Sequence, residues 1–284
     1  MKRPTGSCTR GLAIAAIAAI ALAGAALPAS DALASGATYG REARLAGATA
    51  VLPNAENEWN YNFGVGFGTA PGYFGDKDYD THLSPLIDID WRQRVFLSTQ
   101  RGLGAVLFRN SSFRMGGRLT YDQGRDNGDS SFIRRLPDVD PSVEAGLFFE
   151  NYSAGWRIWG DARKGLQSEG HNGLLGSLGV DRAGRISDRA SIVAGASVTA
   201  ASKRYNDAYF GVPRNTAGFA VAGFTPEAGV RDVGAHLNFI FQVTDQIYFT
   251  VDATLNLLLG DPSKSPIVRE DLPFYVGTSV GVRF

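Results

Sequence analysis

The chain has almost no cysteine, no second long hydrophobic run and no excess of charge of either sign. Its only cysteine, Cys8, precedes the apolar run near the N-terminus, so we expect it to be removed with that segment. A mature chain without thiols excludes disulfides, cysteine-ligated metals and cysteine nucleophiles. Lysine plus arginine and aspartate plus glutamate number 28 each, so no basic excess indicates nucleic-acid binding.

The N-terminal segment has the order of a secretory signal peptide. A basic start precedes an apolar run over 11–27 and a small-x-small cleavage site over 32–34. We therefore expect residues 1–34 to be removed on export and residues 35–57, which show no periodicity, to form a periplasmic tail. Beyond the signal, no apolar run reaches the roughly 18 residues that a transmembrane helix needs.

What the sequence has in abundance is glycine and aromatic residues. It contains 35 glycines, and 11% of its residues are aromatic. Both suit a barrel in a lipid bilayer, where small residues leave room in the lumen and aromatic side chains lie at the two membrane interfaces. A soluble β-sandwich or lipocalin-like barrel would explain alternation along strands, but not a wholly apolar face opposite a polar, glycine-rich one.

The C-terminal segment carries the clearest strand pattern. From Phe274 to Phe284, apolar residues alternate strictly with small or polar ones. This indicates a β-strand with one apolar face, about as long as the 9–11 residues that a tilted strand needs to cross a bilayer. A closing strand that ends on an aromatic residue resembles the signal by which outer-membrane barrels are recognised for assembly, so Phe284 is the predicted assembly signal.

Similar alternation recurs along the chain and predicts an all-β fold, a transmembrane antiparallel up-and-down barrel of about twelve strands over 58–284. The expected strands are 58–68, 82–91, 94–99, 103–109, 112–122, 142–151, 154–164, 172–184, 188–202, 231–243, 246–258 and 274–284.

The connections support this strand count. Short turns alternate with long loops rich in Gly, Asp, Asn and Pro, as expected for periplasmic turns and outer loops; the short turn over 100–102 is the exception. Residues 216–227 resemble a further strand, but thirteen strands would place the long loop over 259–273 in the periplasm. We therefore assign 203–230 to a long outer loop that folds into the barrel mouth.

Charged residues lie in mid-strand on the polar faces. Because lipid cannot solvate them, their side chains should point into the lumen. Charges of both signs are compatible with a paired, closed lumen or with a narrow channel for small solutes, and a wide pore would need about sixteen strands or more. The predicted lumen-facing polar network is Asp88, Asp90, Arg114, Arg118, Glu144, Arg157, Asp161, Arg163, His236 and Asp252.

The sequence offers no convincing catalytic or metal site. His82 and His171 are expected near the outer rim, but no Gly-x-Ser-x-Gly elbow accompanies them. Asp76, Asp78 and Asp80 are spaced like the start of a calcium loop without its glycine and closing glutamate, so we expect a solvated acidic loop. A weak cation site that bridges lipopolysaccharide phosphates is the alternative there. We predict no enzyme activity, no cofactor and no resident metal.

Several stretches resemble the MipA/OmpV family of outer-membrane proteins, and they span nearly the whole mature chain. The YFGV and SPI pieces within them are the most specific. The matching stretches are GVGFGTAPGYFGDKDYDTHLSPLIDIDWR (64–92), the Gly-Arg pair 124–125, RYNDAYFGV (204–212), AGVRDVG (228–234), GDPSKSPIV (260–268) and the strand ending at Phe284.

The resemblance implies an outer-membrane barrel that contacts lipid and lipopolysaccharide and is inserted by the barrel-assembly machinery. Within the family, one member is described as a scaffold between a murein hydrolase and a murein synthase, and others as porin-like proteins or surface adhesins and antigens. We therefore expect a scaffold or structural protein linked to murein enzymes. A narrow porin-like channel or a surface adhesin is the alternative.

Overall fold

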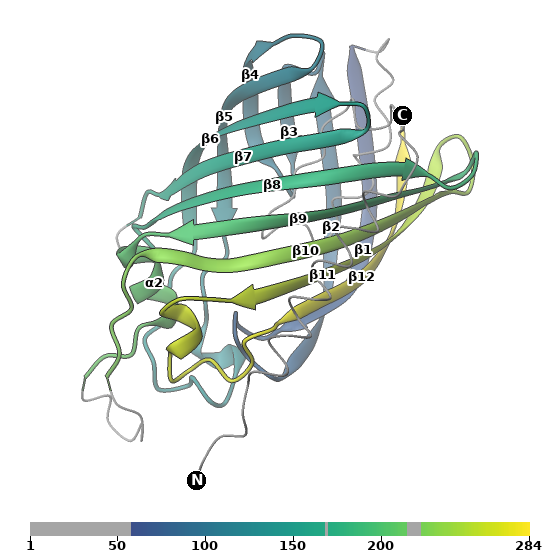
Figure 1. Ribbon diagram of the computed structural model, residues 1–284. Coiled ribbons are helices and arrows are strands. Elements are labelled where there is room, and N and C mark those ends of the chain that lie inside the picture. Colours follow the sequence, from purple (N-terminus) through teal and green to yellow (C-terminus); the bar gives the residue numbers. More distant parts are fainter. Residues whose placement is uncertain (1–57, 168–169, 215–222) are drawn as a thin grey trace.

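A computed structural model describes residues 58–167, 170–214 and 223–284, which form one closed antiparallel barrel (Figure 1). Each strand pairs with its neighbours in the sequence, and the last strand pairs with the first. The strands are β1 (Trp59–Pro71), β2 (Tyr79–Trp91), β3 (Val95–Ser98), β4 (Gly102–Arg109), β5 (Phe113–Asp122), β6 (Ser142–Ser153), β7 (Trp156–Gly165), β8 (Leu174–Arg185), β9 (Ala190–Ala201), β10 (Gly229–Gln242), β11 (Ile247–Leu258) and β12 (Phe274–Arg283).

The predicted fold class is confirmed. All twelve expected strands are present, and their ends differ from the predicted ones by at most three residues. The predicted signal peptide, 1–34, and tail, 35–57, lie outside the described residues.

Closure of the barrel depends on the two terminal strands. β1 and β12 pair from Asn62↔Arg283 to Thr69↔Val276. Beyond this ladder, the backbone N–H of Phe284 donates to the carbonyl oxygen of Tyr61 at 2.9 Å. The last residue of the chain therefore completes the hydrogen bonding of the first strand, which leaves no open sheet edge at this seam.

The strands present apolar side chains outward and polar or small ones inward. On β12, Phe274, Val276 and Val280 are 40–48% exposed, whereas Tyr275 and Ser279 are at most 8% exposed. An outer surface of this kind along a whole barrel would aggregate in water but is solvated by lipid. Aromatic pairs lie near both ends of this surface, including Trp59 with Trp91 and Tyr79 with Phe274.

The two ends of the barrel differ. The short-turn end carries Phe284 and most of the tight connections, and the long-loop end carries the long connections, described over 72–78, 123–141, 166–167, 170–173, 202–214, 223–228 and 259–273. The short helix α2 (Lys203–Phe210) and the 3-10 turns η3 (Asn127–Asp129) and η4 (Pro262–Lys264) lie in these loops (Figure 1). Within the described part of the chain, no helix is long and apolar enough to cross a membrane.

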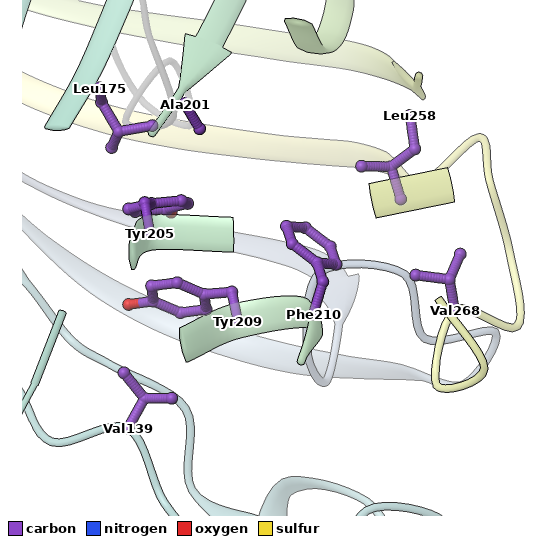
Figure 2. Close-up of a cluster of buried hydrophobic side chains, with 8 residues drawn as sticks. All are labelled: Val139, Leu175, Ala201, Tyr205, Tyr209, Phe210, Leu258 and Val268. Carbon is purple, nitrogen blue, oxygen red and sulfur yellow. The ribbon is translucent and has the colours of Figure 1, made fainter. Parts of the chain in front are cut away.

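The segment 203–230 differs from the plain loop that we expected. Its first eight residues form α2, which Ser202 caps by accepting a hydrogen bond from the backbone N–H of Tyr205. The helix buries Tyr205, Tyr209 and Phe210 in an apolar cluster at the long-loop end (Figure 2). The helix was missed because a stretch of eight residues has too few turns to show helical periodicity.

The hairpin of β3 and β4 is short because its turn folds inward. β3 pairs only with the last four residues of β2, from Asp88↔Ser98 to Trp91↔Val95. The hydroxyl of Ser98 accepts hydrogen bonds from the backbone N–H groups of Gln100 and Arg101. This explains the one short connection that broke the predicted alternation of turns and loops.

Candidate functional site

The ten side chains of the predicted lumen network are buried or partly buried. Asp90, Arg114 and Asp161 are partly buried, and the other members are buried. In most cases each charge lies against an opposite one, so ion pairs follow the inner wall of the barrel. The buried members are Asp88, Arg118, Glu144, Arg157, Arg163, His236 and Asp252.

One chain of ion pairs runs around the inner wall from β5 to β10, and we call it the lower ladder. Arg114 contacts Glu150, which accepts from Arg157 at 2.7 Å. Arg157 also donates to Asp181 at 3.0 Å, and Asp181 lies 3.0 Å from His236 Nε2. Arg157 is fully buried, so its guanidinium depends on these two carboxylates for compensation.

A second chain of ion pairs, the upper ladder, lies closer to the long-loop end. Arg118 donates to Asp161 at 2.5 Å, and Arg163 lies 3.5 Å from the same carboxylate. Arg163 also donates to Glu144 at 3.1 Å, and Thr120 donates to this carboxylate at 2.8 Å. These side chains come from β5, β6 and β7, which pair side by side, so the residues on their inward faces lie next to one another.

The remaining predicted charges have separate partners. Asp88 receives a bidentate contact from Arg101, with hydrogen bonds of 2.9 and 3.1 Å, and Asp90 lies 3.9 Å from the same guanidinium. On β10 and β11, Asn238 donates to Asp252.

Sequence reasoning missed several members of these ladders. Glu150 lies an even number of residues from Glu144 on β6, and Asp181 lies an even number of residues from the other inward residues of β8. Because alternate residues of a strand face the same side, this spacing could have identified both as inward-facing. Arg101 lies in a turn and had no periodic signal. Its inward position depends on how the β3–β4 turn folds.

At the top of the upper ladder, a histidine meets two carboxylates. Asp122 ends β5, Glu144 lies near the start of β6, and His171 lies in the loop between β7 and β8. Asp122 Oδ2 and Glu144 Oε1 are each 3.1 Å from His171 Nε2, and all three residues are fully buried. Their ligand-type atoms lie within 4.8 Å of one another. Burial alone would lower the pKa of His171, but the two carboxylates outweigh it and raise the pKa above its ordinary value.

Helix α2 covers this cluster. The ring of His171 lies 4.9 Å from that of Tyr205 in an edge-on arrangement, and Tyr205 stacks on Tyr209 at 4.7 Å. The hydroxyl of Tyr209 donates to Asp122 Oδ1 at 2.5 Å. Figure 2 shows the two tyrosines side by side on the helix, among apolar residues from the ends of strands, such as Leu175 and Leu258, and from loops, such as Val139.

The other predicted histidines and acidic residues are placed apart from this cluster. His82 is exposed on β2, and His236 belongs to the lower ladder. The expectation of a solvated acidic loop was wrong for Asp76, which is fully buried and bound by Arg269, whereas Asp78 is exposed and accepts from Arg269 at 2.7 Å. The guanidinium comes from the β11–β12 loop, a distant segment whose approach the local spacing did not indicate.

The two ladders lie along the inner wall, mostly over β5 to β8, and most of their side chains are buried. On the opposite side, between the inner faces of β9 to β12 and Phe74, lies a cavity of about 50 Å³. Its lining is mixed, with apolar side chains such as Phe74 and Ala235 beside the polar Ser197, His236 and Asn256, and it has room for a few water molecules.

Comparison with known protein families gives one match over most of the described chain. A family model described as "MltA-interacting protein MipA" matches residues 63–284. No curated protein matches the sequence as a relative.

Among solved structures, the chain is similar to a bacterial polysaccharide outer membrane secretin, with 9% identity, a TM-score of 0.42 and coverage of 80% of this chain and 98% of that one. It is also similar to OmpF from Salmonella typhi, with 8% identity, a TM-score of 0.38 and coverage of 82% and 99%. OmpT from Vibrio cholerae matches with 7% identity, a TM-score of 0.34 and coverage of 80% and 96%. These likenesses concern the barrel fold alone.

Proposed function

The chain belongs to the family of MltA-interacting protein MipA, and from this premise we propose that it is a closed outer-membrane barrel with a structural, scaffolding role. The observation that carries the proposal is the ion-paired lumen. The two ladders join the inner faces of β5, β6, β7, β8 and β10, and α2 packs over the upper one. A protein of this construction anchors other components at the membrane instead of passing solutes.

The energetics of buried charge support a closed lumen. A wide water-filled path beside the wall would leave pairs such as Arg157 with Glu150 and Asp181 exposed, but their side chains are at most 2% exposed. Removal of one partner from a buried pair costs about 3–5 kcal/mol, because the other charge is left uncompensated. Several such pairs in series make spontaneous opening rare.

The proposed orientation follows from the two ends. The short-turn end, with Phe284, faces the periplasm, and the long-loop end with α2 faces outward, as is usual for barrels with short periplasmic turns. Export through a cleaved signal over 1–34 and insertion by the barrel-assembly machinery belong to the same proposal.

The family name suggests the partner. MltA-interacting protein names an interaction with another protein, and we propose a murein hydrolase or synthase as the partner of this chain. The periplasmic turns are only a few residues long and offer little surface for docking. The segment 35–57, which precedes β1, is therefore the proposed docking element.

Single-channel recording of the purified protein in planar bilayers tests the closed lumen. We expect no steady conductance from the wild type. A stable open conductance would overturn the proposal in favour of the competing function, a narrow channel for small solutes.

Affinity capture with a purified lytic transglycosylase tests the scaffold role. We expect the full mature chain to retain the enzyme and a chain lacking 35–57 to lose it, while both chains keep the heat-modifiable gel mobility of a folded barrel. Equal capture by the two chains would rule out docking through this segment, and no capture by either would contradict the murein link itself.

A further inference from the structure

We propose that Asp122, Glu144 and His171 form a binding site for one divalent transition-metal ion, of which zinc is the best-fitting example. The three residues come from the end of β5, the start of β6 and the β7–β8 loop. Their side chains meet at the long-loop end, beneath α2. This inference is independent of the scaffold role, because it concerns how the barrel mouth is held and which ion it takes.

The spacing of the donor atoms fits a small cation. Asp122 Oδ2 and Glu144 Oε1 are each 3.1 Å from His171 Nε2, and the three atoms lie within 4.8 Å of one another. A tetrahedral zinc ion, with ligands at about 2.0–2.2 Å, places those ligands about 3.3–3.6 Å apart. The observed cluster therefore needs only small side-chain movements to accept the ion, and a fourth position is left for water.

The carboxylates are oriented by contacts on their far sides. Tyr209 donates to Asp122 Oδ1 at 2.5 Å, while Thr120 and Arg163 donate to Glu144 Oε2 at 2.8 and 3.1 Å. These contacts occupy the outward oxygens and turn the other oxygen of each carboxylate toward His171. Outer contacts of this kind set the direction and basicity of ligands in metal sites.

The surroundings of the His171 imidazole are a second, independent indication that an ion binds here. His171 is fully buried, and neither of its ring nitrogens has a hydrogen-bond partner with good geometry among the described residues, although Nε2 faces both carboxylates. The fold also makes room for it, because a Cβ atom on Gly165 would lie 1.8 Å from the carbonyl oxygen of His171. The imidazole nitrogen and two carboxylate oxygens thus provide three converging donor atoms in a buried place, an arrangement that a metal ion can bind.

The donor set selects the class of ion. One imidazole with two carboxylates suits zinc or a similar first-row cation, whereas calcium and magnesium prefer oxygen ligands alone. The two carboxylates also balance the charge of a dication. Once bound, the ion would join three segments of the long-loop end and fix His171 under Tyr205 and Tyr209.

Zinc binding to the untagged, full mature protein in detergent tests the proposal. After removal of metals with a chelator, titration calorimetry with zinc chloride near neutral pH should show one equivalent bound, and X-ray absorption should show a single imidazole with oxygen ligands. His171→Gln and Asp122→Asn should each weaken binding at least about tenfold. His236→Gln, which removes another buried imidazole that faces a carboxylate, is the matched control and should bind zinc like the wild type.

The readouts separate loss of a ligand from loss of the fold. Heat-modifiable gel mobility reports a folded barrel for each variant, and if His171→Gln does not fold, Asp122→Asn carries the comparison. The proposal is overturned if the wild type binds no zinc, if it binds only calcium or magnesium, or if His236→Gln loses as much affinity as Asp122→Asn. In each of those cases the cluster is not a zinc site.

Discussion

At the scale of single residues, the packing of side chains inside the barrel depends on glycine as well as on charged residues. Gly165 on β7 faces Glu144 across the ladder to β6, and His171 fills the space that a side chain there would need. The histidine is thereby brought under α2 without a break in the strand. A residue without a side chain thus decides where a buried imidazole lies.

The substitution Gly165→Ala should destabilise the protein by about 1–3 kcal/mol, the usual cost of overpacking a closely packed site. Its Cβ would lie 1.8 Å from the carbonyl oxygen of His171 and 2.8 Å from Nδ1. Urea unfolding in detergent, followed by tryptophan fluorescence, measures the change. Gly117→Ala is the matched control, since its nearest neighbouring atom is 3.7 Å away, and an equal loss in both variants would contradict the steric explanation.

Buried and exposed ion pairs in this barrel should differ sharply in how much they contribute to the free energy of unfolding. Glu150 is 2% exposed and compensates both Arg114 and Arg157, whereas the pair between Glu58 and Arg92 at the short-turn end is more than half exposed. Water and salt screen the second pair but not the first.

We expect Glu150→Gln to lower the free energy of unfolding by about 3–5 kcal/mol, because it leaves the buried guanidinium of Arg157 and the partly buried one of Arg114 with one carboxylate fewer. The exposed counterpart, Glu58→Gln, should cost less than about 1 kcal/mol. Urea midpoints of the two variants against the wild type provide the comparison. Similar costs for both would show that the lumen is hydrated well enough to screen its charges.

At the scale of elements, α2 is held by its cap as well as by packing. The hydroxyl of Ser202 accepts hydrogen bonds from the backbone N–H of Leu174 at 2.8 Å and of Tyr205 at 3.5 Å, so it links the helix to the start of β8. A helix of eight residues has little stability of its own, so such local contacts carry much of its order.

Replacement Ser202→Ala should destabilise α2 by about 0.5–2 kcal/mol, the range for loss of an N-cap. Hydrogen exchange of the amides over 203–210 should become faster, while exchange in β1 and β12 stays unchanged. Ser263→Ala, which removes a hydroxyl that donates to Gly260 in an exposed loop, serves as the control and should leave α2 unaffected. Unchanged exchange in Ser202→Ala would mean that packing alone holds the helix.

At the scale of the whole molecule, closure makes the barrel a single unit. β12 pairs with β11 on one side and with β1 on the other, so the last strand of the chain joins the earliest and latest parts of the barrel. Phe284 follows β12, is 63% exposed, and continues the hydrogen bonding to β1 through Tyr61. Its side chain therefore stays exposed in the closed barrel although its backbone pairs with β1.

Substitution Phe284→Ser should reduce the amount of folded protein in the outer-membrane fraction several-fold without changing the barrel that does form. Heat-modifiable mobility of that fraction measures the yield. Phe108→Ser, which removes an aromatic residue of similar exposure from β4, is the control for a general loss of lipid contact. Equal losses in the two variants would argue against a signal specific to the C-terminus.

The number, order and faces of the strands were predictable from the sequence because alternation is a local property. A period of two along each segment determines which side chains face lipid and which face inward, whatever the neighbouring strand. The alternation of tight turns and long loops then predicted that the strands run up and down in sequence order. The charges of β5 and β7 were assigned to the lumen on this basis, and the structure places Arg118, Arg157 and Arg163 in buried positions.

The partners of these charges, and the cluster beneath α2, were decided only by the tertiary structure. Arg157 meets Asp181 because β7 and β8 pair in that register, and a pattern within one strand carries no information about its neighbour's register. His171 meets Asp122 because a loop folds back over Gly165. Loop conformations and cross-strand contacts depend on long-range packing, so a sequence with clear strands predicted the wall of this barrel but not the side-chain contacts inside it.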